Sequence, residues 1–345
     1  MRTTLGAPRF GVWAPVYGTW GARTHPGEIP DASYRRTRDL VLRAEQLGFD
    51  STLVAQHVLH PGSLEHDVLE TWSTLAGLAE ATSDIELIGA IKPLLFHPLV
   101  FAKLVANIEE IASDRLAINL VSGWFLPELE AMGLGSITHD DRYGHSREWL
   151  DVVGHLWRGG VIESGLDGAV GAGVRLRPAL AHAPRVYLGG ESEPARALAA
   201  SHADVFFLNG RPPEDVSVII DDLRGRERDR PEPLRFGLSA FVIARESAEE
   251  AQSEFRYLQG LVDRSAQRDR TAGADAATAM FKVHEGTARV GTNGGTLAGL
   301  VGSYGQVAER ITKFADLGID LFMLQFQPLE TEMDRFATHI LPLFR

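Results

Sequence analysis

The feature that most constrains the fold is a regular alternation of short apolar runs with longer amphipathic segments along the whole chain. Short apolar runs are typical of buried strands, and apolar positions spaced at helical intervals are typical of helices packed on a core. The pattern predicts strands at residues 9–16, 51–57, 85–91, 115–121, 185–190, 204–210, 234–245 and 321–326. It predicts helices at residues 31–48, 68–82, 98–113, 140–158, 193–202, 213–228, 247–265 and 303–317.

Eight successive strand–helix units predict a (β/α)8 TIM barrel, with a doubly wound open sheet as the alternative. The matching segments "LGFD" (47–50) and "LGID" (317–320) support this assignment, because glycine commonly ends a helix before the chain enters the next strand. Barrels of this size are single domains, so we expect residues 1–345 to form one domain.

Two segments do not belong to the eight strand–helix units of a minimal barrel. Residues 159–184 are rich in glycine and show little helical periodicity, which predicts an inserted hairpin or loop. Residues 266–302 are polar and then rich in glycine, which favours a mobile lid over a further domain.

The composition excludes several classes of function. A net charge of −12 disfavours nucleic acids and anionic membranes as partners. The chain has no cysteine, so it contains no disulfide, thiolate metal site or cysteine nucleophile. It also has no run of about 18 apolar residues that would span a membrane, and "MRTTLGAPRF" lacks the apolar core of a signal peptide. We therefore expect a cytoplasmic protein.

In a TIM barrel the active site lies at the carboxyl ends of the strands. The side chains at these ends indicate neither a serine nucleophile at a strand–helix elbow nor the carboxylate pair of a glycosidase. They are mostly aromatic, amide or hydroxyl groups, which suit a flat ligand with polar edges. These residues are Trp13, Tyr17, Trp20, Gln56, His57, His60, Lys92, Asn119, Ser122, Trp124, Glu191, Ser192, Asn209, Phe241, Gln325 and Gln327.

A group of histidines follows the second predicted strand, in "QHVLHPGSLEHD" (56–67). His57, His60, His66 and Asp67 could bind a metal ion, as in barrel hydrolases. Such enzymes draw their ligands from several strands, and here the other strand ends offer no carboxylate to complete the site. We therefore interpret these residues as loop histidines, of which one or two contact a ligand.

Two glycine-rich turns, "GGES" (189–192) and "GTNGG" (291–295), could present backbone N–H groups to a phosphate or be plain turns. In "HDDRYGHSREWL" (139–150), Asp140 or Asp141 could cap a helix whose other charges face solvent. Arg142 is unfavourable in a first helical turn, which indicates that it pairs with an anion.

The segments "NLVSGW", "HDDRY", "YLGGES" and "GSYGQVAERITKFADLGIDLFMLQF" together resemble the bacterial luciferase-like flavin monooxygenases. The resemblance is closest to the group of alkanesulfonate, dimethyl-sulfone and pyrimidine monooxygenases. It implies an eight-stranded barrel that uses reduced FMN and dioxygen. It also implies a separate NAD(P)H:flavin reductase as the supplier of reduced FMN, and a homodimer or homotetramer.

The resemblance also implies roles for individual residues. Asn119 would face the polar edge of the flavin ring, although an amide bonded to neighbouring backbone is the alternative. The cofactor-binding residues would be Gln56, His57, Ala90, Asn119, Glu128, Arg142, Tyr143, Gly190 and Ser192, with the ribityl phosphate held by Arg142, Tyr143 and Ser192.

Departures from the family pattern bear on the substrate. Alkanesulfonate enzymes carry an arginine and a histidine where this chain has Ser239 and Phe241, a lid arginine at Asn293, and a tyrosine at Gln327. A sulfonate bound in this chain would therefore lack the cationic side chains that neutralise it in those enzymes. "SAFVIAR" is instead similar to the dimethyl-sulfone enzymes, which implies a small neutral substrate. The pyrimidine enzymes have a threonine at the position of Ala90 in this chain, so this chain departs from their pattern as well.

We thus predict a two-component FMN-dependent monooxygenase that transfers one oxygen atom to its substrate beneath the 266–302 lid. His57 and Asn119 are the predicted catalytic residues, with His57 handling protons. The predicted substrate pocket is formed by Trp13, Trp20, Trp124, Phe241 and Gln327, some of which could be ordinary packing at the barrel rim. The alternatives are a deazaflavin-dependent oxidoreductase, a non-catalytic flavin-binding protein, and a metal hydrolase.

Overall fold

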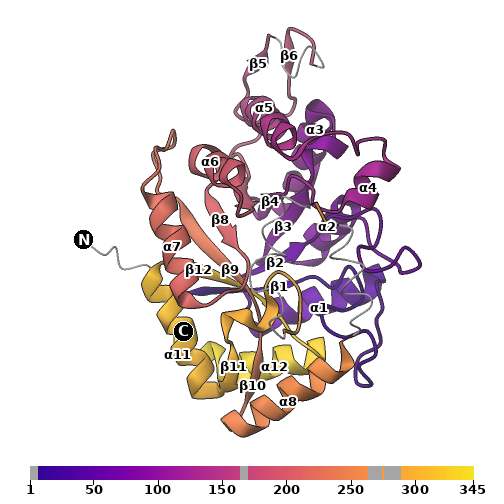
Figure 1. The fold of residues 1–345 in the computed structure, drawn as a ribbon. Coiled ribbons are helices and arrows are strands. Elements are labelled where there is room, and N and C mark those ends of the chain that lie inside the picture. Colours follow the sequence, from indigo (N-terminus) through magenta and orange to yellow (C-terminus); the bar gives the residue numbers. More distant parts are fainter. Residues whose placement is uncertain (1–6, 164–169, 263–273, 276–288) are drawn as a thin grey trace.

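The computed structural model describes residues 7–163, 170–262, 274–275 and 289–345. Its centre is a closed parallel barrel (Figure 1) in the order β1-β12-β9-β8-β7-β4-β3-β2, and β2 pairs again with β1. Closure confirms the predicted TIM barrel and excludes the open doubly wound sheet. The strands are β1 (Arg9–Trp13), β2 (Ser51–Val54), β3 (Glu86–Ile91), β4 (Leu116–Leu120), β7 (Arg185–Gly189), β8 (Val205–Leu208), β9 (Arg235–Phe241) and β12 (Ile319–Gln325).

The seam between the first and last strands is closely packed. Phe10 is opposite Phe322, and Gly11 is opposite Met323. A Cβ added at Gly11 would clash with Ser51 Oγ and would lie 2.8 Å from Met323 Cε, so a larger residue would displace both side chains. The sequence therefore closes the barrel with large side chains beside a glycine that makes room for them.

Helices surround the barrel, as Figure 1 shows. Each predicted helix has a counterpart, and the apolar face of each packs on the strands because only that face can be buried. The helices are α1 (Tyr34–Leu47), α2 (Thr71–Ala81), α3 (Pro98–Ala112), α5 (His139–Trp157), α6 (Glu193–His202), α7 (Pro213–Arg224), α8 (Ala248–Leu261) and α11 (Tyr304–Leu317). The periodicity did not predict α4 (Leu126–Ala131), α12 (Leu329–His339) and the 3-10 turns η1 (Pro93–Leu95), η2 (Gly295–Ala298) and η3 (Leu341–Phe344).

The predicted strand 234–245 is divided in the structure. β9 ends at Phe241, and β10 (Ile243–Arg245) pairs in parallel with β11 (Val301–Ser303) outside the barrel. Both β9 and β10 are mostly buried. The apolar run therefore continues from one strand into the other and does not indicate where β9 ends.

The two predicted insertions have different outcomes. β5 (Val161–Ile162) and β6 (Val174–Arg175) form the antiparallel hairpin predicted for residues 159–184. Most of the predicted 266–302 lid lies outside the described residues. Its described end is attached to the barrel, since Asn293 O accepts the N–H of Gly210 at 2.8 Å and Gln325 Oε1 accepts the N–H of Thr292 at 2.9 Å. Within the described ranges, no helix is long and apolar enough to span a membrane.

Candidate active site

A pocket opens at the carboxyl ends of β1, β2, β3, β4, β7 and β8, where the barrel fold predicts a site. Its empty volume is about 1100 Å³, including the solvent at its mouth. Its walls contain most of the predicted site residues, namely Trp13, Trp20, Gln56, His57, Ala90, Asn119, Trp124, Tyr143, Gly190 and Ser192. Glu128, Arg142, Phe241 and Gln327 lie behind the walls, each in a different environment described below.

Asn119 is buried on β4 and lines the pocket. Its side-chain oxygen, Oδ1, is buried and accepts no hydrogen bond from the part of the chain that the structure describes. A buried amide oxygen without a donor is costly, by about 1 to 3 kcal/mol. The arrangement therefore favours a bound molecule that presents an N–H or O–H group to Asn119.

An aromatic wall forms one side of the pocket. The rings of Trp13 and Trp20 lie 5.0 Å apart, and those of Tyr17 and Trp20 lie 4.8 Å apart with an edge-to-face geometry. Trp13 and Trp20 are each only 4% exposed. Two hydrogen bonds fix their orientation, from Trp13 Nε1 to Ser239 Oγ at 3.2 Å and from Trp20 Nε1 to the Ala14 carbonyl at 3.2 Å. This wall can exclude water from a planar ligand.

A buried ionic cluster adjoins this wall, where β2, β3 and α4 meet, and the rings of Tyr17 and His57 lie 5.8 Å apart. Glu128 is fully buried behind the wall, forms an ion pair with Lys92, and lies 3.3 Å from His57 Nδ1. Its Oε1 also accepts the N–H groups of Val58 at 2.6 Å and Leu59 at 3.2 Å. Burial alone would raise the pKa of Glu128, but the contacts with His57 and Lys92 outweigh it and bring the pKa to about 2. Glu128 is therefore ionised.

The "GGES" turn forms the pocket wall at the amino end of α6. Gly190 adopts a φ of 139°, and a Cβ there would lie 2.8 Å from Tyr143 Oη, so the turn requires glycine. Ser192 is the N-terminal cap residue of α6, but its side chain does not cap the helix. Burial raises the pKa of Tyr143, although the hydroxyls of Ser192 and Ser122 lower it, so Tyr143 remains a neutral phenol. The turn suits an anionic group.

Arg142 lies in the first turn of α5 and is 2% exposed, and its partner is a carboxylate of the chain itself. The guanidinium forms an ion pair with Asp275 and donates to the Ile137 carbonyl at 2.9 Å. The anion predicted beside Arg142 is thus present as Asp275. Arg142 is not among the pocket-lining residues. A contact between Arg142 and a phosphate stays a prediction.

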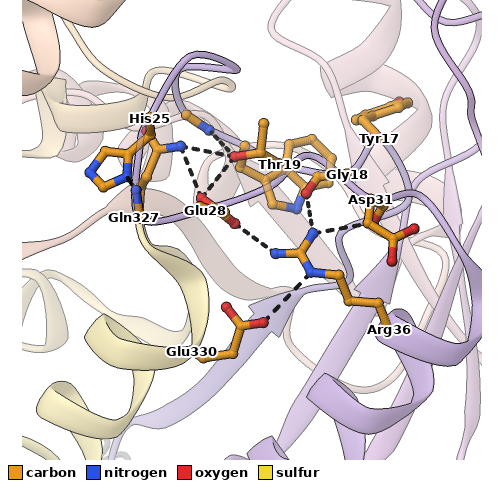
Figure 2. Close-up of polar contacts among 12 residues, drawn as sticks. Tyr17, Gly18, Thr19, His25, Glu28, Asp31, Arg36, Gln327 and Glu330 are labelled. Carbon is orange, nitrogen blue, oxygen red and sulfur yellow. Dashed lines mark hydrogen bonds and ion pairs between the residues drawn. The ribbon is translucent and has the colours of Figure 1, made fainter.

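The structure places two predicted pocket residues elsewhere. Phe241 belongs to a separate apolar cluster with Ile243, Ala251, Leu258 and Val290. Gln327 follows β12 and is bonded behind the aromatic wall (Figure 2), where it contacts Thr19, Ala22 and Glu28. Its side-chain groups are engaged by this loop, so the expectation that it contacts substrate is corrected.

His60 and His66, in the loop after β2, serve local structure. His60 Nδ1 accepts the N–H groups of Gly62 at 3.0 Å and Ser63 at 3.2 Å, and the rings of His60 and His66 lie 5.0 Å apart. Among the described residues, no group of three or more histidine, cysteine, aspartate or glutamate side chains could hold a metal ion.

Sequence reasoning assigned no role to several wall residues. Glu191 lines the pocket and forms an ion pair with Arg211, and Asn209 Nδ2 donates to Glu191 at 3.0 Å. Arg211 directly follows the predicted strand 204–210, so its position after a strand end could have marked it as a site residue. Five lining residues, Tyr17, Lys92, Ser122, Glu191 and Asn209, were predicted at strand ends but were given no individual role.

The chain is similar to known proteins over nearly its whole length. The family described as luciferase-like monooxygenase matches residues 9–321. An FMNH2-dependent dimethylsulfone monooxygenase of Pseudomonas putida is 30% identical over 98% of this chain and 95% of the relative. Its counterpart in Pseudomonas fluorescens (strain Pf0-1) is 29% identical with the same coverage.

Among solved structures, a riboflavin lyase bound to modified FMN and riboflavin has a TM-score of 0.80 at 19% identity, covering 98% of this chain and 91% of that chain. At this identity the likeness supports the fold alone. The family match spans nearly all of the barrel, from β1 into β12. This chain therefore belongs to the luciferase-like monooxygenase family, as its sequence motifs predicted.

Proposed function

We propose that this protein is a monooxygenase that uses reduced FMN and dioxygen to oxygenate a small neutral molecule. The observation that carries the proposal is the nearly full-length similarity to two FMNH2-dependent dimethylsulfone monooxygenases. We place the reaction in the pocket at the carboxyl ends of the strands, within a single domain of residues 1–345.

The residues of the pocket fit reduced FMN. A reduced flavin ring carries N–H donors, and the unpaired Oδ1 of Asn119 lacks one. The turn at Gly190, with Ser192 and Tyr143 beside it, offers the α6 N-terminus to a phosphate. When bound, the cofactor supplies the electrons that activate dioxygen.

The chain's own contribution is to orient the ligands and to keep water out. Trp13, Trp20 and Trp124 line the pocket with apolar surface. This apolar surface would exclude water from the bound cofactor while substrate is oxidised. Asn119 and His57 are the polar groups that we propose to contact the reacting ring.

The charges of the pocket favour a neutral substrate. Among the lining residues in the described ranges, Lys92 is the single lysine or arginine, and Glu128 neutralises it. A sulfonate or carboxylate substrate would thus find no available cation in this wall and would be bound poorly. Dimethyl sulfone and other small uncharged molecules are the proposed substrate class.

The proposal includes partners and location. The relatives are named for the cofactor in its reduced form, so we propose that a separate NAD(P)H:flavin reductase delivers FMNH2 in the cytoplasm. We also propose a homodimer or homotetramer, because α3 exposes the apolar side chains of Val100 and Ile111.

Two measurements test the function. Anaerobic titration with reduced FMN should show saturable binding, and no binding at millimolar FMN would contradict the proposal. Oxygen uptake and product formation should then be followed with a flavin reductase, dimethyl sulfone and a matched sulfonate. The neutral compound should be oxygenated preferentially. Hydride transfer to a deazaflavin without oxygen uptake would support the alternative oxidoreductase, and binding of FMN without turnover would support a flavin-binding protein.

A further inference from the structure

Lys92 is a buried lysine that lines the pocket, and its place at a strand end did not indicate its role. It follows β3, is 2% exposed, and has three polar groups close to its Nζ atom. Two of them can only accept, namely the Gln56 carbonyl at 2.8 Å and the carboxylate of Glu128, and the third is His57 Nδ1 at 3.2 Å.

His57 Nδ1 has two polar neighbours of opposite character. It lies 3.2 Å from Lys92 Nζ, which is a donor, and 3.3 Å from Glu128 Oε1, which is an acceptor. In a neutral imidazole, Nδ1 either carries a proton and donates or lacks one and accepts. The cluster therefore allows two tautomers, and the surrounding hydrogen bonds decide between them.

The hydrogen bonds to Glu128 favour the tautomer in which Nδ1 accepts. Oε1 of Glu128 already receives two backbone N–H groups, from Val58 and Leu59, so both of its lone pairs are engaged. A proton on Nδ1 would also face the ammonium of Lys92, and a doubly protonated His57 would place two cations 3.2 Å apart in a buried site.

Lys92 must be charged for this argument to hold. Burial lowers the pKa of Lys92, and the neighbouring Glu128 carboxylate opposes that shift. The Glu128 carboxylate contacts Lys92 directly and accepts the N–H groups of Val58 and Leu59, and these contacts favour its ionised form. The Gln56 carbonyl and the Glu128 carboxylate are both acceptors, and an ammonium at Lys92 satisfies both.

We propose that Lys92 is a positioning residue that holds His57 in its neutral form with the proton on Nε2. A neutral imidazole with its proton on Nε2 has no lone pair at that atom, so His57 would not act as a base there. This consequence for the reaction rests on the proposed function, whereas the tautomer is a property of the protein without flavin.

The test is nuclear magnetic resonance of protein labelled with ¹⁵N-histidine, recorded without flavin at pH 7. The His57 signals are assigned by their loss in His57→Gln. We expect an unprotonated Nδ1 and a protonated Nε2. A wild-type spectrum with a protonated Nδ1, in either the neutral or the cationic ring, overturns the proposal.

Three lysine variants separate positioning from general structure. Lys92→Met removes the donor, so the His57 signals should move toward the Nδ1–H or cationic pattern. Lys92→Arg keeps charged donors and should retain the wild-type pattern. Lys103→Met is the control, because Lys103 lies on α3 and donates to the Arg177 carbonyl away from the pocket. An unchanged tautomer in a folded Lys92→Met protein would overturn the role of Lys92.

Circular dichroism establishes whether each variant is folded. If Lys92→Met does not fold, the wild-type and Lys92→Arg spectra still decide the tautomer and its retention by a charged donor. Reduced FMN binding is measured separately on the same samples. A protein with the expected tautomer that does not bind FMN would contradict the proposed function and leave the tautomer assignment intact.

Discussion

Gln327 and Glu28 are joined by a buried hydrogen bond of 2.9 Å, from Gln327 Nε2 to Glu28 Oε2, across 299 residues of sequence. Thr19 and Arg36 complete the contacts of Glu28 (Figure 2). The loop that follows β1 is thereby fixed to the end of β12. Because Trp20 belongs to this loop, the bond positions the aromatic wall from behind.

Gln327→Ala should therefore destabilise the protein and loosen the wall. The substitution removes the acceptor of the Ala22 N–H group and a hydrogen-bond donor to the buried Glu28. The free energy of unfolding should fall by about 2 to 3 kcal/mol. Urea unfolding measures this cost, and the tryptophan emission should shift to the red as Trp20 gains solvent. The control is Gln252→Ala on exposed α8, which should change stability by less than about 0.5 kcal/mol. Equal effects of the two substitutions would contradict the assigned role of Gln327.

Asn119→Ala should weaken the binding of reduced FMN about tenfold, which corresponds to the loss of one hydrogen bond of about 1.4 kcal/mol. The measurement is anaerobic fluorescence titration. Asn107→Ala on the exposed face of α3 is the matched control and should bind as the wild type does. Unchanged affinity in the Asn119 variant would show that the amide does not contact the cofactor.

Glu109 gives a prediction on pH. Burial raises its pKa from 4.5 to about 7, against a hydrogen bond from the Leu116 N–H that lowers it. The folded protein thus holds this proton more tightly than the unfolded chain, so rising pH between 4.5 and 7 costs stability, and below 4.5 no cost remains. The full cost is roughly 3 kcal/mol.

Glu109→Gln should remove this cost, so its stability advantage over the wild type should grow between pH 5 and pH 8 by up to about 3 kcal/mol. Urea unfolding at both pH values measures the difference. Glu110→Gln, at the exposed neighbouring position, is the control and should show no such growth. If the two variants behave alike, Glu109 is not the group responsible.

Trp20→Leu should uncouple oxygen consumption from oxygenation, because a smaller side chain admits water to the pocket. We expect more hydrogen peroxide and less product per oxygen consumed, measured with an oxygen electrode and a peroxide assay. Tyr257→Leu replaces an aromatic side chain that is 45% exposed on α8 and should leave the ratio unchanged. A wild-type ratio in Trp20→Leu would mean that this side chain does not exclude water.

The sequence alone determined the barrel and much of the pocket. Periodicity located each barrel strand, because the alternation of apolar positions records which face is buried. Strand ends then collect at one rim, which brought Gln56, Asn119 and Ser192 into one predicted site. The asparagine within a buried strand was informative for the same reason, since a buried amide needs a partner.

Only the tertiary structure decided which long-range partners these residues have. Local sequence showed that Arg142 needs an anion, but the structure supplied Asp275, 133 residues away. It likewise joined Lys92 to Glu128 and moved Gln327 behind the wall. Such pairings depend on the paths of loops across the barrel rim. Those paths are set by packing across the whole molecule and leave no periodic signal in the chain.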